Sequence, residues 1–181
     1  MKYKKVKLFS LHPEEYPDLE IEFKIIDDMK TYAENLMQHF PVQFAQKTAQ
    51  VKARKGKLNE EVDTRARVLH DGRMYVMSET KNKVTMENSM IVTNPDGEEY
   101  ILKPEKFALR YDCTHYEDIY AAKSDVIQFV YLNENIVFQS PWCGDMFAHE
   151  GAALNVTHLN DIYCIQNCLF DNTYSIVNKT L

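Results

Sequence analysis

The segment NPDGEEYILKPEKFALRY, residues 94–111, carries in order the signals of a turn, a strand and a short helix. Pro95 fixes its own backbone dihedral and Gly97 accepts a positive one, so residues 94–97 predict a tight hairpin turn. The turn leads into a strand over 99–102. Pro104 is tolerated at the first helical position and begins one or two helical turns that end near Arg110. We expect the hairpin to pair this strand with an apolar strand over 89–93.

A similar arrangement returns in the second half of the chain. Aligned without a gap, residues 88–111 and 151–174 share the pattern Tyr-x6-Phe-x3-Tyr, and an apolar strand and a polar turn precede it in both segments. The aligned aromatic residues are Tyr100 with Tyr163, Phe107 with Phe170, and Tyr111 with Tyr174. We therefore predict an internal duplication, in which the first aromatic residue packs inward and the other two lie on a short helix that closes the sheet.

The N-terminal residues predict two strands followed by a helix. Residues 4–9 and 19–25 alternate apolar and charged side chains, as half-buried strands do. Asp27 and Asp28 are candidate caps for a helix that ends at Pro41. Its apolar face contains Met29, Tyr32, Leu36 and Phe40.

From these elements we predict an α+β fold, with N-terminal strands plus a helix followed by two related β-rich modules. The expected units are residues 1–45, residues 46–112 and residues 113–181. The connection over 112–123 lacks Gly and Pro and favours a helix or an ordered crossover over a flexible tether.

Composition sets the broad class. The chain has 181 residues and a hydrophobic fraction of 45%, which is enough to form a core. Its net charge is −6 and its Lys and Arg residues are scattered, which argues against a nucleic-acid partner. An apolar run long enough to span a membrane is missing, as is a signal sequence, so we expect a cytoplasmic protein with reduced thiols.

The segment 84–112 resembles small phage and prophage proteins of the PGDYG type. The matching residues are Gly97, Glu98, Tyr100, Lys103, Pro104, Phe107 and Tyr111, and residues 51–53 are similar to the opening strand of that family. The Pro-Gly-Asp-Tyr tetrad from which the family takes its name is replaced by Glu87-Asn-Ser-Met90. The resemblance implies a phage origin and a structural module, and it supplies no mechanism.

The densest group of reactive residues lies in 142–168. Cys143 with His149 or His158 has the residue types of a thiol nucleophile and its base, which makes a small Cys-His enzyme one alternative. A second alternative is a zinc module that also uses Cys164 and Cys168, although the spacing lacks the close Cys pairs of structural zinc sites. The aliphatic counterpart of Cys164 in the aligned segment is Ile101, which favours a buried thiol.

Other catalytic and nucleotide motifs are missing from the sequence. The chain has five Gly and none in a Gly-x-Gly arrangement, which excludes a P-loop or a Rossmann turn. The acidic residues near 96–99 and 112–118 lack the spacing of a calcium loop and are typical of solvated turns. Tyrosines crowd the second half of the chain and are enriched at binding surfaces.

The leading hypothesis is a non-enzymatic binding protein, encoded by a phage or prophage, that acts on a host protein or a small-molecule ligand and antagonises a host protein or defence system. We expect its binding surface around Trp142, His149, His158 and Tyr131. We expect no cofactor, no metal and no membrane partner, and we leave the oligomeric state open. The third hypothesis is a phage structural or assembly adaptor.

Overall fold

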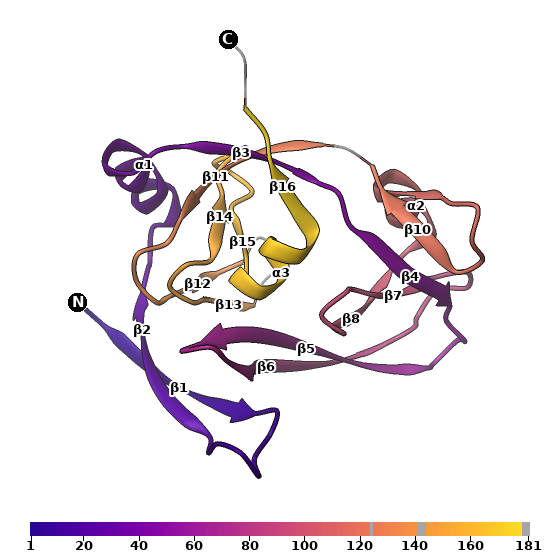
Figure 1. Ribbon diagram of the computed structural model, residues 1–181, viewed down its shortest axis with the longest axis horizontal. Helices are drawn as coiled ribbons and strands as arrows, with labels where there is room; N and C mark the ends of the chain where they lie inside the picture. The colour runs from indigo at the N-terminus through magenta and orange to yellow at the C-terminus, as the bar shows by residue number, and fades with distance from the viewer. Residues whose placement is uncertain (124, 141–143, 179–181) are drawn as a thin grey trace.

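The computed structural model describes residues 1–123, 125–140 and 144–178, and strands dominate this part of the chain. The described strands form one six-stranded sheet and two five-stranded sheets. Figure 1 shows the two five-stranded sheets on opposite sides of the molecule, with a long hairpin below them and a short helix between them.

The two five-stranded sheets have matching strand orders. The first runs β8 (Glu99–Leu102), β7 (Met90–Thr93), β4 (Gln50–Lys55), β10 (Ile119–Ala122) and β9 (Tyr111–Cys113). The second runs β15 (Tyr163–Ile165), β14 (Ala153–Asn155), β11 (Val126–Tyr131), β3 (Gln43–Lys47) and β16 (Tyr174–Ile176). Neighbouring strands are antiparallel throughout both sheets.

The two sheets also agree in register. Tyr100 pairs with Val92 in the first sheet, and Tyr163 pairs with Asn155, the residue aligned with Val92, in the second. At the opposite edges Tyr111 pairs with Ala122, and Tyr174 pairs with Lys47. The residues that the gapless alignment equates therefore have equivalent strand partners.

The sheets exchange one strand each. β3 leads directly into β4, yet β3 pairs with β11 and β16 in the second sheet while β4 belongs to the first. In the same way β10 precedes β11 but pairs with β4 and β9. The pairings thus cross the expected boundaries near residues 45 and 112, and each five-stranded sheet draws a strand from the other half of the chain.

Two short helices close the sheets in the same manner. α2 (Pro104–Arg110) begins with Pro at its first turn, as predicted, and α3 (Asn167–Thr173) is its counterpart. Each ends where a tyrosine N–H donates to a phenylalanine carbonyl, Tyr111 to Phe107 and Tyr174 to Phe170. The two rings of each pair lie 5.2 and 5.1 Å apart between centroids, respectively.

The six-stranded sheet joins the N-terminal strands to both halves. Its order is β13 (Asp145–Ala148), β12 (Ile136–Gln139), β2 (Leu19–Ile25), β1 (Tyr3–Ser10), β6 (Arg73–Lys83) and β5 (Glu61–His70). The turn of the β5–β6 hairpin has positive φ at Asp71 (49°) and Gly72 (73°), as a tight hairpin turn requires. Its tip is tied to α3, because Leu69 and the Asn167 side chain exchange two hydrogen bonds of 3.3 and 3.1 Å.

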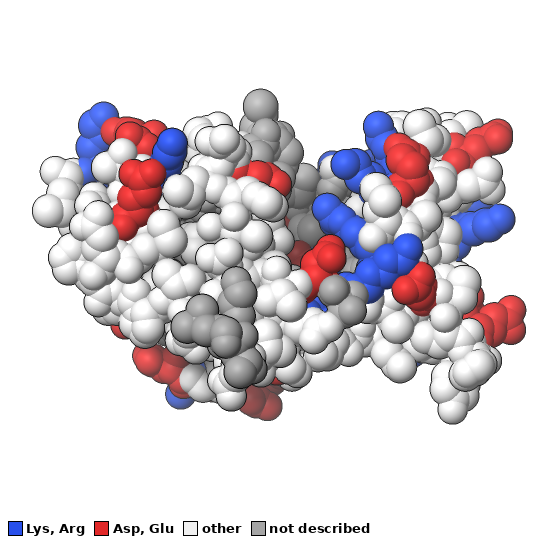
Figure 2. Space-filling model, turned by 90° about the horizontal axis from the view of Figure 1, so that it is seen from above, with Lys and Arg blue, Asp and Glu red and all other residues white. Residues whose placement is uncertain are grey.

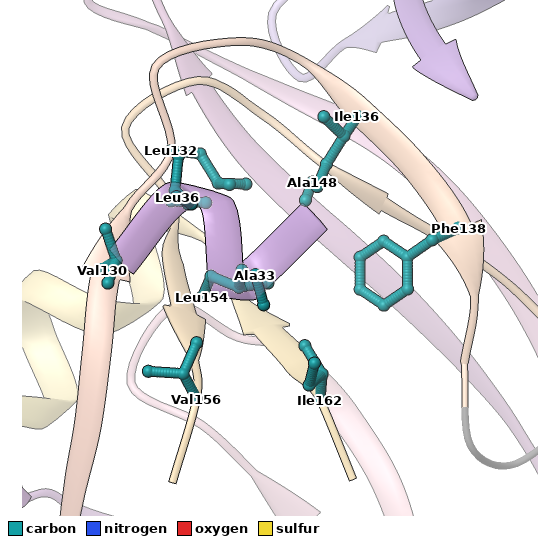
Figure 3. Close-up of a cluster of buried hydrophobic side chains, with 11 residues drawn as sticks. Ala33, Leu36, Val130, Leu132, Ile136, Phe138, Ala148, Leu154, Val156 and Ile162 are labelled. Atoms are coloured by element: carbon teal, nitrogen blue, oxygen red, sulfur yellow. The ribbon is translucent and has the colours of Figure 1, made fainter. Parts of the chain in front are cut away.

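The largest apolar cluster lies where the only long helix in the described part of the chain meets the second half. α1 (Met29–His39) is capped by Asp28, whose carboxylate accepts from the Thr31 N–H at 3.0 Å. Ala33 and Leu36 from this helix pack against Leu154 and Ile136, as Figure 3 shows. The sequence prediction of this helix is confirmed, but Phe40 lies at its C-terminal cap and is 37% exposed, outside the core.

The predicted α+β class is wrong, because the fold is β-rich. Two of the three helices in the described residues, α2 and α3, have only seven residues each. They cap the ends of sheets and do not form a layer of their own. The predicted helix or crossover over 112–123 contains the strand β10.

A membrane-spanning helix is not found in the described residues, since none of their helices has the length and the apolar character that a span requires.

We predict that Phe129→Ala lowers the free energy of unfolding by about 3–5 kcal/mol, because a large core side chain is replaced by a cavity. Phe129 is fully buried in the second sheet, and its ring lies 4.7 Å from that of Phe170. The control Val126→Ala removes a side chain that is 50% exposed on the same strand and should change stability by less than about 0.5 kcal/mol. Urea unfolding measures both, and equal effects of the two variants would contradict this packing.

Candidate functional site

A cavity of about 910 Å³ lies between the two five-stranded sheets. β3 and the β5–β6 hairpin supply residues from the first part of the chain, and α3 and β16 supply residues from the end. In Figure 2 the molecule is hollowed between two halves, and Lys and Arg side chains gather beside the hollow together with acidic ones. The volume is at the upper end of that found for small-molecule sites.

Tyrosines from both halves face this cavity. Tyr100 and Tyr111 line it from the first sheet, and Tyr163 and Tyr174 occupy the equivalent positions in the second. The Tyr100 and Tyr111 hydroxyls lie 2.8 Å apart and hydrogen-bond each other. Burial raises the pKa of Tyr100, Tyr163 and Tyr174, so these side chains remain neutral phenols that can donate and accept hydrogen bonds.

Three cationic side chains line the cavity without a carboxylate partner among the described residues. They are Lys47 on β3, Arg67 on β5 and Arg110 at the end of α2. The Lys47 ammonium donates to the Tyr111 hydroxyl at 3.1 Å and lies 5.4 Å from the centre of its ring. Arg67 donates from Nη1 to the backbone carbonyl of Asp96.

Two buried polar atoms of the cavity wall lack a hydrogen-bond partner in the described structure. One is the Arg67 Nε donor, and the other is the Asn94 Oδ1 acceptor. Asn94 is 6% exposed, and its amide nitrogen donates to Glu98 at 3.1 Å. A buried unpaired polar group costs about 1–3 kcal/mol, and such groups are therefore concentrated where a ligand or water completes the bonding.

The surroundings of Glu98 disfavour the charged form of its carboxyl group. Burial, followed by the nearby Asp96 carboxylate, raises the pKa of Glu98 to about 7, while the Asn94 hydrogen bond and the charges of Lys47 and Arg67 oppose the rise. Near neutral pH the carboxyl group is therefore present in both forms. It can accept hydrogen bonds when ionised and also donate one when protonated.

Some of the residues that carry the PGDYG resemblance contribute to this wall. Glu98, Tyr100 and Tyr111 line the cavity directly. Gly97 has φ of +88°, and a Cβ atom there would lie 3.0 Å from Arg67 Nη1, so the position favours glycine for both its conformation and its space. The turn recognised from the sequence therefore also holds Arg67 against the 94–98 backbone.

The predicted binding residues fall in different places. His158 lines the cavity. His149 is buried outside it, where its Nε2 lies 2.8 Å from Nδ1 of His70, and burial lowers its pKa. Tyr131 lies 36% exposed beside Phe129 and Phe170, away from the cavity, and Trp142 lies outside the described residues.

The described residues supply no arrangement of side chains that supports the Cys-His enzyme or the zinc module. Cys143 lies outside them. Burial raises the pKa of Cys164 and raises that of Cys168 to about 11, so both thiols are protonated at neutral pH, whereas nucleophiles and metal ligands are thiolates. The one cluster of three possible metal ligands in the described part of the chain is the exposed group His12, Glu14 and Glu15, which contains none of the predicted ligands.

Sequence reasoning missed Lys47, Arg67, Arg110 and Asn94. Lys47 and Arg67 lie on separate strands that are not consecutive in the sequence, and the exchange of β3 brings Lys47 beside Tyr111. A usable signal was present for the other two, because Asn94 begins the strongest turn of the sequence and Arg110 directly precedes the repeated tyrosine.

Comparison of the chain with protein-family models, with curated proteins and with solved structures gave no match.

We predict that Glu98→Gln stabilises the protein at alkaline pH and has little effect at acidic pH. The folded-state pKa of Glu98 is raised, so its carboxyl group favours folding below the unfolded pKa near 4.5 and opposes it as the pH rises through about 7. At pH 8 the free energy of unfolding of the Gln variant should therefore exceed that of the wild type by on the order of 1–3 kcal/mol.

Chemical denaturation of both proteins at pH 5 and pH 8 measures this difference. The matched control is Glu105→Gln. Glu105 lies exposed in the first turn of α2, so this variant should show no such pH dependence. An equal effect of Glu98→Gln at the two pH values would contradict the burial of this carboxyl group.

Proposed function

We propose that this protein is a non-enzymatic binding protein that takes a small molecule into the cavity between its two five-stranded sheets. The observation that carries the proposal is the pair of buried, unpartnered polar atoms in the cavity wall, Arg67 Nε and Asn94 Oδ1. A cavity of this size that also leaves a donor and an acceptor unpaired is suited to a ligand that supplies both partners.

The chemistry of the wall favours binding over catalysis. The tyrosine hydroxyls stay protonated, because burial raises the pKa of Tyr100 and Tyr174. The thiol Cys164, which also lines the cavity, has a raised pKa for the same reason and is a poor nucleophile. These groups hold and orient a ligand by hydrogen bonds and ring contacts.

The proposed setting is a phage or prophage in its host. Three of the residues that carry the resemblance to PGDYG-type proteins, Glu98, Tyr100 and Tyr111, line the cavity, so resemblance and site overlap. Under this proposal the protein removes a small molecule from the host cytoplasm and so antagonises a host process such as defence. A host protein as partner and the assembly adaptor stay predictions from the sequence.

We predict that Ala66→Phe abolishes ligand uptake while the fold is kept. Ala66 lines the cavity from β5, and a phenyl ring there occupies space that the ligand needs. The matched control is Thr80→Phe, which adds the same ring at an exposed position of the same hairpin, outside the cavity.

The measurement is native mass spectrometry after incubation with the low-molecular-mass fraction of a bacterial extract and removal of the excess. Wild type and Thr80→Phe should carry an adduct that Ala66→Phe lacks, and all three should unfold cooperatively. An adduct that Ala66→Phe retains, or wild-type protein without any adduct, would show the proposal to be wrong.

A further inference from the structure

The tyrosines of the cavity are repeated in its two halves, but its cations are not. Tyr100 and Tyr111 have the counterparts Tyr163 and Tyr174. Arg110 precedes Tyr111, whereas the equivalent residue before Tyr174 is Thr173. Lys47 pairs with Tyr174, whereas the equivalent partner of Tyr111 is Ala122. Each sheet therefore contributes one cation that the other lacks, and both cations lie beside Tyr111 of the first sheet, because Arg110 precedes it and the Lys47 ammonium donates to its hydroxyl.

The cations act on the tyrosine cluster at close range. Lys47 donates to the Tyr111 hydroxyl. Arg110 lines the cavity together with Tyr100, Tyr163 and Tyr174, and its charge partly opposes the rise in their pKa that burial causes. An anionic group bound between Lys47 and Arg110 would therefore also reach phenol donors.

The carboxylates of the wall only partly oppose an anion. Asp145 is neutralised by Lys4, whose ammonium lies 2.6 Å away. Glu98 is part protonated near neutral pH. Asp96 accepts a hydrogen bond from the Glu98 N–H at 3.0 Å, and Asp125 lies exposed at the rim. Lys47, Arg67 and Arg110 keep their charges for a ligand.

The unpaired polar atoms point to a second chemical requirement. Arg67 Nε offers a donor and Asn94 Oδ1 offers an acceptor. Asn94 begins the 94–98 turn, and Arg67 donates to the Asp96 carbonyl of the same turn. A heterocyclic base presents donors and acceptors side by side along one edge and a flat face to aromatic rings. Stacking of a base on an aromatic side chain contributes about 1–3 kcal/mol.

We propose that the ligand is a nucleotide, with its phosphoryl group between Lys47 and Arg110 and its base edge at Arg67 and Asn94. This inference rests on the proposed function. It requires neither a P-loop nor a Rossmann turn, because side chains from β3, β5 and α2 take the place of a glycine-rich backbone cradle.

The test is isothermal titration with defined probes. They are the four 5′-mononucleotides, cyclic AMP, cyclic di-GMP and NAD⁺, compared with the four nucleosides and inorganic phosphate. At least one nucleotide should bind at least tenfold more tightly than its nucleoside and than phosphate, roughly the difference expected for charge-assisted hydrogen bonds. Arg110→Gln should lower the affinity for that nucleotide by about tenfold or more.

The matched control is Lys106→Gln, which removes an exposed charge one turn earlier on α2 and outside the cavity. It should change the affinity by less than about twofold. If nucleoside and nucleotide bind equally, or the two variants behave alike, the inference is wrong. If every nucleotide fails while Ala66→Phe still blocks an adduct of other chemistry, the inference falls and the proposed function stands. If nothing binds and wild type carries no adduct, both fall.

Discussion

The exchange of β3 and β10 between the two five-stranded sheets is the constraint from which the rest of the architecture follows. The crossover at Thr48 and Ala49 is short and is hydrogen-bonded to both halves. The N–H groups of Thr48 and Ala49 donate to the Thr173 carbonyl at 2.8 and 3.2 Å, and the Ala49 carbonyl accepts from Ala122 at 3.2 Å. Separating the sheets would break these bonds together with the β3 and β10 ladders, so the sheets are held facing each other with a space between them.

That space explains why polar groups are buried where a solid core would exclude them. The apolar clusters on either side contain matching aromatic pairs, Phe107 with Tyr111 and Phe170 with Tyr174. These two tyrosines also line the cavity, where the Tyr111 hydroxyl hydrogen-bonds the Lys47 ammonium and the Tyr100 hydroxyl. A protein that tolerates buried, unpaired polar atoms at one location has a local conflict that a bound partner can relieve, and such conflicts are typical of functional sites.

Much of the local structure could be predicted from the sequence because its causes are local. The turn at 94–97, the strand after it and α2 follow from Pro, Gly and the order of apolar residues, and the spacing of the tyrosines equates residues that share a register. The α+β class is wrong because it rests on the one helix over 29–39, whereas strands dominate the described residues and the later helices are brief caps. The strand exchange leaves no periodic trace, since β3 and β10 have the same pattern whichever sheet receives them. The cations of the site were missed for the same reason: Lys47, Arg67 and Arg110 come together only through long-range pairing.

A crystal structure of the protein with its small-molecule ligand bound is the sharpest test of this binding site. We expect ligand density between the tyrosines of the two sheets, with an acceptor on Arg67 Nε and a donor on Asn94 Oδ1. Ligand density elsewhere on the molecule, with these two atoms paired to other side chains and the cavity closed, would contradict it.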